Sequence, residues 1–219
     1  MTEFETCPDP IFLLGILPRS GTNFLYDLLC LHPACQAGPI PEDYLLYHAA
    51  RLRDYSQAVA GNWFPQWGVD DQEAVLFPHL GRGLVSFLTS QQNQDSASPK
   101  RLVTKTPGVR HLDKFFTLFP QAHLIILVRD GRAVIESGMR SFDWHFEAMT
   151  RSWANAARTI LTFDPSRPDN DLNYMIIHYE KLVADTETEL RKVFDFLELR
   201  TEIYDFEAAL NAPVKGSSE

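Results

Sequence analysis

The sequence predicts an α/β fold in which a central parallel sheet is flanked by helices on both faces. Short apolar runs alternate along the chain with segments whose apolar residues recur at helical spacing. This alternation is typical of a parallel sheet, because each helix returns the chain to the edge from which the next strand starts. Four strands are expected, at Ile11–Leu14, Arg101–Lys105, His123–Val128 and Asn173–Tyr179. His123–Val128 is almost entirely apolar, as a strand buried on both faces should be.

The first strand leads into a short polar loop, Pro18–Asn23, and then into a helix that begins near Thr22. A loop of this kind directs backbone N–H groups, a helix N-terminus and the Arg19 guanidinium into one small volume. Such an arrangement suits a phosphate or a sulfate. An ordinary strand-to-helix turn that carries a surface arginine fits these residues equally well.

The remaining helices follow from apolar spacing and from capping residues. They are expected from about Glu42 to Val59, from Asp70 to Leu88 with a break or kink at Pro78, from Val109 to Phe119, after Arg132 through Ser137, and from Trp144 to Phe163. A last helix is expected from Thr186, which would form a capping box with Glu189. Glu42 and Asp43 would cap the second of the chain's helices if they had no other role.

Cationic or polar residues stand at the ends of all four expected strands. Ligands bind at the carboxyl ends of the strands in sheets of this type. This rule places Arg19, Lys105, Arg129 and the residues after Tyr179 on one edge of the molecule. Structural ion pairs account for some of these residues, but their convergence favours an anion site.

Length, charge and cysteine content limit the classes of protein to which this chain can belong. The 219 residues suit one domain, 1–219, and their formal charge of −9 argues against nucleic acid as a partner. No apolar run approaches the length of a membrane span, so no membrane partner is expected. Cys7, Cys30 and Cys35 follow no metal-ligand spacing, and no metal is expected. Acidic residues near the N-terminus and the few cysteines predict a cytoplasmic protein.

Three sequence motifs follow one another along the chain. They are Pro18–Asn23, Leu127–Val134 with Ser137 eight residues past Arg129, and Tyr179–Leu182. In this order they resemble the sulfotransferase superfamily, whose donor is 3′-phosphoadenosine-5′-phosphosulfate (PAPS). The resemblance implies a P-loop-like three-layer sandwich. It covers nearly the whole chain and is closest to the tyrosylprotein sulfotransferase type and related bacterial enzymes.

The resemblance implies where PAPS and its product 3′-phosphoadenosine-5′-phosphate (PAP) would bind. The first motif resembles the 5′-phosphosulfate loop and the second resembles the 3′-phosphate site. The implied nucleotide-binding residues are Arg19, Ser20, Gly21, Thr22, Asn23, Arg129, Ser137 and Tyr179. The first loop lacks the lysine of a Walker A motif, which disfavours a small-molecule kinase. A non-catalytic nucleotide-binding protein of the same fold is a further alternative.

The implied reaction is an in-line transfer of a sulfuryl group to an acceptor hydroxyl or amine on a small molecule, without a metal. Glu42 is the best match to the catalytic glutamate of the tyrosylprotein type, because the segment after Lys105 lacks the histidine that the cytosolic type uses. Asp43 competes for this role. Arg19 and Lys105 would neutralise the charge that develops during transfer. The sequence identifies neither the acceptor nor the oligomeric state.

The C-terminal residues depart from the pattern of the family. Members usually continue beyond a segment like Ala212–Ser218, whereas this chain stops at Glu219. The resemblance therefore implies a single domain that lacks the usual C-terminal segment. Lys215 and Ser217 are expected to contribute to the nucleotide site.

Overall fold

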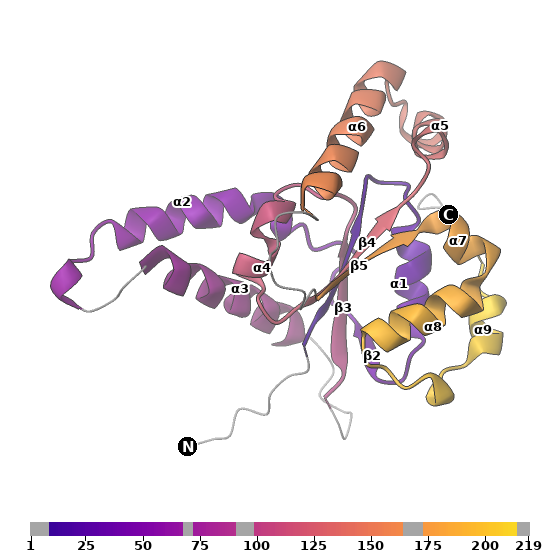
Figure 1. The fold of residues 1–219 in the computed structure, drawn as a ribbon, viewed down its shortest axis with the longest axis horizontal. Coiled ribbons are helices and arrows are strands. Elements are labelled where there is room, and N and C mark those ends of the chain that lie inside the picture. The colour runs from indigo at the N-terminus through magenta and orange to yellow at the C-terminus, as the bar shows by residue number, and fades with distance from the viewer. Residues whose placement is uncertain (1–8, 68–71, 91–98, 164–172, 214–219) are drawn as a thin grey trace.

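A five-stranded parallel sheet forms the centre of the computed structural model, which describes residues 9–67, 72–90, 99–163 and 173–213 (Figure 1). The strand order is β2-β3-β1-β4-β5. The strands are β1 (Ile11–Gly15), β2 (Cys35–Ala37), β3 (Arg101–Thr106), β4 (His123–Val128) and β5 (Tyr174–His178). The four strands predicted from the sequence are confirmed. The sequence analysis missed β2, because three residues that include Gln36 show no apolar pattern.

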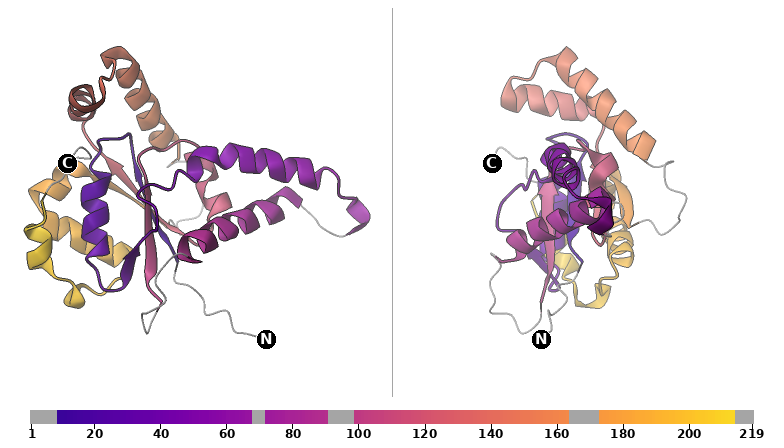
Figure 2. Two further views of the ribbon diagram at one scale, coloured as in Figure 1. Left: turned by 180° about the vertical axis from the view of Figure 1, so that it is seen from behind. Right: turned by 90° about the vertical axis from the view of Figure 1, so that its left-hand side faces the viewer.

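Helices cover both faces of this sheet and make the three predicted layers (Figures 1 and 2). The alternation of side chains along β1 explains both cores. Ile11 and Leu13 pack with α1 (Thr22–Cys30), α8 (Thr186–Phe196) and α9 (Phe206–Leu210) on one face. Phe12 and Leu14 pack on the other face, where the core includes residues of α3 (Gln72–Ser90), α4 (Phe115–Leu118) and α6 (Phe146–Phe163).

Two pairs of helices extend away from the sheet. One pair is α2 (Ala49–Ala60) with α3, and the other is α5 (Gly131–Phe142) with α6 (Figure 1). Of the break or kink expected at Pro78, the break is wrong, because Pro78 lies inside the continuous helix α3. Asp70, at which that helix was expected to begin, lies outside the described residues.

Two other predicted helix boundaries and one predicted cap differ from the structure. The helix expected from Glu42 begins at Ala49, and a 3-10 turn precedes it. The helix expected from Val109 is reduced to a 3-10 turn followed by α4, since His111 adopts a left-handed φ of 60°. The N-cap of α8 is Asp185 instead of Thr186, and its carboxylate accepts a hydrogen bond from the N–H of Thr188 at 3.1 Å.

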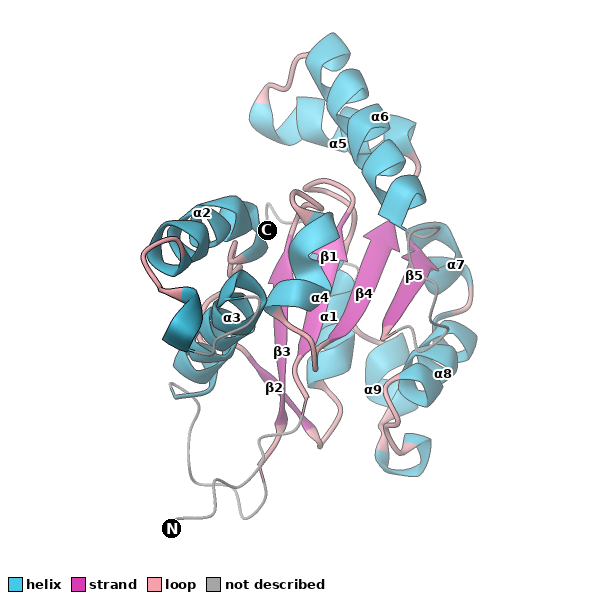
Figure 3. Cartoon of the chain, turned by 60° about the vertical axis from the view of Figure 1, so that its left-hand side comes forward, coloured by secondary structure: helices cyan, strands magenta, loops and turns pink. Residues whose placement is uncertain are grey.

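The strand register places the candidate site residues. Leu13 of β1 lies opposite Lys105 of β3 on one side and opposite Ile125 of β4 on the other. The short helix α7 (Tyr179–Ala184) starts directly after β5. Because all the paired strands are parallel, their carboxyl ends meet at one edge of the sheet, as Figure 3 shows.

Candidate active site

The loop between β1 and α1 is fixed by its own hydrogen bonds. The Ser20 hydroxyl, which is fully buried, donates to the Leu17 carbonyl at 2.5 Å and accepts from the Leu17 N–H at 3.2 Å. Arg19 and Gly21 both have positive φ, 72° and 92°. No side chain among the described residues caps α1, so the N–H groups of its first turn are open to an anion.

Tyr179 joins this loop to the end of β4. A Cβ atom on Gly21 would lie 2.3 Å from Cδ2 of Tyr179, so a glycine is required where the ring packs on the loop. The centroid of the same ring lies 4.3 Å from the Cζ atom of Arg129, within cation–π range. Three segments that are distant in sequence therefore meet at one ring.

Two arginines complete this arrangement, which we name the cation cluster: Arg19, Arg129, Ser137 and Tyr179. Nη1 of Arg129 donates to the Arg19 carbonyl at 2.8 Å, and Nε of Arg19 donates to the Ser137 hydroxyl at 2.9 Å. Nε of Arg129 is buried and has no hydrogen-bond partner within the described part of the chain. A buried donor without a partner is costly, which makes this guanidinium a suitable site for an anion.

The end of β4 is braced by its neighbours. The Trp153 indole donates to the Arg129 carbonyl at 3.2 Å, and the Asp130 N–H donates to the Glu180 carboxylate at 2.8 Å. Asp130 also caps α5 by accepting from the N–H of Arg132 at 2.8 Å. Hydrogen bonds from Arg132 hold the pKa of Asp130 down at about 2. The backbone around Arg129 is thus fixed from α6 and from α7.

A second arrangement lies beside β3, in the segment 38–45, which we name the base loop. Its anchor is Asp43, whose side chain is buried. The hydroxyls of Thr104 and Thr106 donate to its two oxygens at 2.7 and 2.9 Å, and the N–H of Leu45 donates at 2.8 Å. Burial raises the pKa of this carboxyl above its usual range. Both oxygens of Asp43 are therefore occupied by protein donors.

The contacts of the Glu42 carboxylate differ from those of Asp43. Its Oε1 atom lies 3.4 Å from Nζ of Lys105, and its Oε2 atom accepts a hydrogen bond from the Tyr44 hydroxyl. The Glu42 side chain is 29% exposed, whereas that of Lys105 is 6% exposed. Nζ of Lys105 also lies 5.6 Å from the ring centroid of Tyr26. Glu42 thus combines contact with a buried cation and access from solvent.

The sequence model of the Sulfotransferase family matches residues 10–202 of this chain. This range includes both the cation cluster and the base loop. The chain belongs to the sulfotransferase family.

Relatives in animals support the same family. A protein-tyrosine sulfotransferase A of Caenorhabditis elegans is 26% identical over 198 residues, which are 87% of this chain and 50% of the relative. A protein-tyrosine sulfotransferase of Drosophila melanogaster is 23% identical over 205 residues, covering 87% of this chain and 38% of the relative. This sulfotransferase chain therefore spans about half the length, or less, of these two relatives.

These relatives correct the expected location. A cytoplasmic protein was predicted from the sequence, whereas protein-tyrosine sulfotransferases are Golgi membrane enzymes. The prediction is wrong because a few cysteines and an acidic first segment are compatible with either compartment. Within the described ranges, no helix has both the length and the apolar character needed to cross a bilayer.

A solved structure agrees with the fold. The sulfotransferase domain of an olefin synthase from Synechococcus PCC 7002 superimposes with a TM-score of 0.61 at 23% identity. The match covers 99% of this chain and 88% of that domain. At this identity the likeness establishes the α/β sulfotransferase fold and nothing finer.

The structure brings most of the residues predicted for the sulfotransferase site to one edge of the sheet. Arg19 contacts Ser137 and Arg129, Arg129 contacts Tyr179, and Glu42 contacts Lys105. Arg19 was expected at the sulfuryl group, but its guanidinium lies beside Ser137, which was expected at the 3′-phosphate. Lys215 and Ser217 lie outside the described residues. No set of three or more metal-ligating side chains is gathered within the described part.

Two features beside the base, the anchoring role of Asp43 and the contact of Tyr44, were not predicted from the sequence. Asp43 was considered only as a cap or a rival base, although it anchors the base loop to β3. Tyr44 was not considered. The alternation Thr104-Lys105-Thr106 was an available signal, because two threonines on one side of a buried strand need a polar partner.

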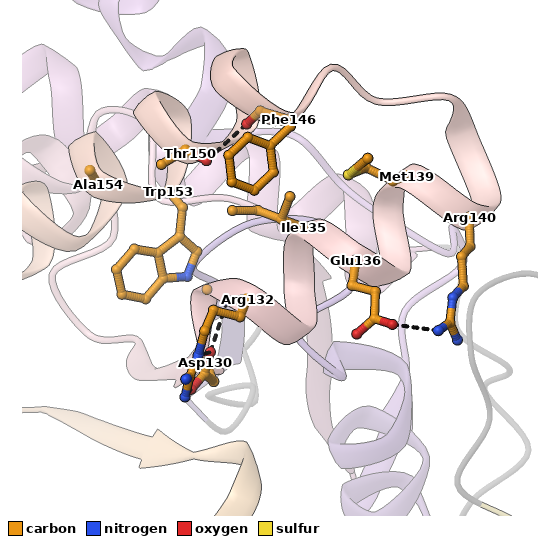
Figure 4. Close-up of a pocket in the computed structure, with 11 residues that line it drawn as sticks. Asp130, Arg132, Ile135, Glu136, Met139, Arg140, Phe146, Thr150, Trp153 and Ala154 are labelled. Atoms are coloured by element: carbon orange, nitrogen blue, oxygen red, sulfur yellow. Dashed lines mark hydrogen bonds and ion pairs between the residues drawn. The ribbon is translucent and has the colours of Figure 1, made fainter.

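A groove of about 930 Å³ lies between α5 and α6 (Figure 4). Its walls are mainly apolar, with Ile135, Met139, Phe146 and Trp153, and charged pairs lie at its rim. Ser137 lies nearly opposite the groove-lining residues around α5, since each residue advances about 100° along a helix. The groove and the cation cluster thus lie on different sides of α5.

Proposed function

We propose that this chain is a single sulfotransferase domain, 1–219, that transfers a sulfuryl group from PAPS to an acceptor hydroxyl and releases PAP. The observation that carries the proposal is the cation cluster. Arg129 contacts the first loop through the Arg19 carbonyl and contacts the start of α7 through the Tyr179 ring. The segments expected at the two ends of PAPS are thereby joined by one guanidinium.

The chemistry of the cluster suits a nucleotide with two phosphate positions. Amide groups of residues 20–23 would hold the 5′-phosphate, because the first turn of α1 has no side-chain cap. Arg129, Ser137 and Arg19 would hold the 3′-phosphate through charge-assisted hydrogen bonds. Tyr179 would support the guanidinium of Arg129. Lys215 and Ser217 remain predicted additions to this site.

Glu42 is the proposed general base. It must reach the acceptor hydroxyl, and its carboxylate is partly open to solvent. Asp43 is a poor candidate, because donors occupy both of its oxygens and the chain buries it. We therefore assign Asp43 the role of positioning Glu42 against β3.

Lys105 is the proposed electrostatic partner of the transfer. Its ammonium group is almost fully buried and lies beside Glu42. A desolvated cation at this place stabilises negative charge more strongly than one in water. Lys105 would therefore offset the charge on the sulfuryl group as it passes from donor to acceptor.

The proposed acceptor is a phenolic hydroxyl, with an amine as the less favoured alternative. The names of the relatives, protein-tyrosine sulfotransferases, support a tyrosine side chain. A carboxylate base suits this acceptor, because it can take the phenolic proton as the new S–O bond forms.

The test is transfer of sulfur-35 from labelled PAPS to a tyrosine peptide. We expect labelled peptide and one PAP for each label transferred. The same chain is incubated with γ-labelled ATP, which tests the kinase alternative. Phosphorylation of the peptide without sulfation would contradict the proposal, and binding of PAP without any transfer would indicate a non-catalytic protein.

A further inference from the structure

Tyr44 places a phenol directly on the proposed base. Its hydroxyl donates to Oε2 of Glu42, while the other oxygen of that carboxylate faces Lys105. The residue is 40% exposed, so that the phenol is not enclosed by the core. The Tyr44 hydroxyl therefore occupies a position relative to Glu42 and Lys105 that an acceptor phenol would have to take.

The backbone holds the phenol in this position. Tyr44 has a φ of 50°, a left-handed conformation that is unfavourable for residues other than glycine. The Tyr44 N–H donates to the Thr106 hydroxyl at 3.1 Å, and the preceding residue, Asp43, is anchored to the same strand. Strain that is maintained by specific contacts at a candidate site is a reason to look for function.

We propose that Tyr44 is itself an acceptor, and that the chain sulfates this residue when PAPS is bound and no other acceptor is present. The inference rests on the proposed function. The bond between the sulfuryl sulfur and the 5′-phosphate oxygen breaks, and a bond forms between that sulfur and the Tyr44 hydroxyl oxygen. Glu42 takes the phenolic proton and later releases it to water, and PAP leaves. No oxidant or further reactant is needed.

The hydrogen bond between Tyr44 and Glu42 makes the base necessary. This bond, together with partial burial, raises the pKa of Tyr44 to about 12. The phenol is therefore protonated at neutral pH and has to lose its proton during attack. Because Glu42 is the group that accepts this hydrogen bond, it is also the group in place to take the proton.

Self-sulfation should compete with transfer to another phenol, since both reactions use Glu42. An excess of N-acetyltyrosine amide should therefore lower the yield at Tyr44 when it is added before PAPS. A sulfated Tyr44 would in turn place an anion beside Glu42, so that prior incubation with PAPS should slow later transfer to the added phenol.

The test is mass spectrometry of the full chain after incubation with PAPS alone. We expect a gain of one sulfuryl group (SO3) per chain, and peptide mapping should place it on Tyr44. The Tyr44→Phe variant should gain none. Tyr55→Phe is the matched control, because Tyr55 is 58% exposed on α2, and it should gain the same group as the unaltered chain.

The outcomes separate this inference from the proposed function. A chain that binds PAP and sulfates N-acetyltyrosine amide but leaves Tyr44 unmodified overturns the inference alone. Modification at Tyr55 or at several tyrosines also overturns it, because the position of Tyr44 on Glu42 would then have no effect. A chain that neither binds PAP nor transfers the label overturns the proposed function as well.

Discussion

The cation cluster and the base loop lie at the same edge of the sheet but are held together by different means. Side chains from three distant segments meet in the cation cluster, and their contacts converge on Arg129. The base loop depends on a single buried carboxylate, Asp43, that fastens it to β3. Substitutions in the cluster should therefore weaken nucleotide binding, whereas substitutions in the base loop should affect turnover or folding.

The largest expected effect is that of Glu42→Gln on turnover. The amide cannot take the acceptor proton, so transfer should slow by about 10²- to 10⁴-fold, the usual contribution of a general base. PAP affinity should not change, because Glu42 belongs to the base loop. Single-turnover transfer of label and calorimetric titration of PAP measure the two quantities. Retention of turnover would remove Glu42 from the role of base.

Asp43→Ala should destabilise the fold. The substitution leaves the hydroxyls of Thr104 and Thr106 and the N–H of Leu45 without their acceptor. We expect the free energy of unfolding to fall by about 3 kcal/mol, as for other buried polar groups that lose a partner. Denaturant titration measures the change. Asp54→Ala on the exposed side of α2 is the control, and an equal loss in that variant would refute the anchoring role.

Asp43 should also give the stability a dependence on pH. Burial raises its pKa above the ordinary value of 3.8, so the folded chain binds this proton more tightly than the unfolded chain. This contribution to stability is present below 3.8 and is lost as the pH rises through the folded pKa. The difference in unfolding free energy between the unaltered chain and Asp43→Asn should therefore decrease as the pH rises above that value. A difference that grows with pH would contradict the assignment.

In the cation cluster, Arg129→Ala should lower PAP affinity by about tenfold to a hundredfold, the range for a hydrogen bond to a charged group. Adenosine 5′-monophosphate, which lacks the 3′-phosphate, should lose little affinity. The matched control is Arg132→Ala, since the side chain of Arg132 is 93% exposed and pairs with Asp130. Equal losses of affinity for PAP and for adenosine 5′-monophosphate would show that Arg129 does not bind the 3′-phosphate.

Ser137→Ala should have the smallest effect. A neutral hydroxyl contributes about 1 kcal/mol, so PAP affinity should fall by about fivefold. Arg19 also loses its hydrogen bond to this hydroxyl. Titration of PAP measures the change, with Ser152→Ala on α6 as the control. A loss as large as that of Arg129→Ala would mean that the two residues act only as a unit.

The contrast between the two regions also explains what the sequence could predict. The cation cluster follows strand ends, and parallel strands bring such ends together, so Arg19, Arg129 and Tyr179 could be grouped from the sequence. The base loop could not, because its position depends on hydrogen bonds between Asp43 and a strand 61 residues further along the chain. Apolar spacing predicted a helix from Glu42, and the anchoring of Asp43 to β3 prevented it.

Comparison of PAP with adenosine 5′-monophosphate tests the central claim most directly. The two nucleotides differ only in the 3′-phosphate, which is the group that the cation cluster is proposed to bind. Calorimetric titration of the unaltered chain should show that PAP binds more tightly, by roughly tenfold to a hundredfold. Equal affinity for the two nucleotides, or tighter binding of ATP than of PAP, would contradict the account.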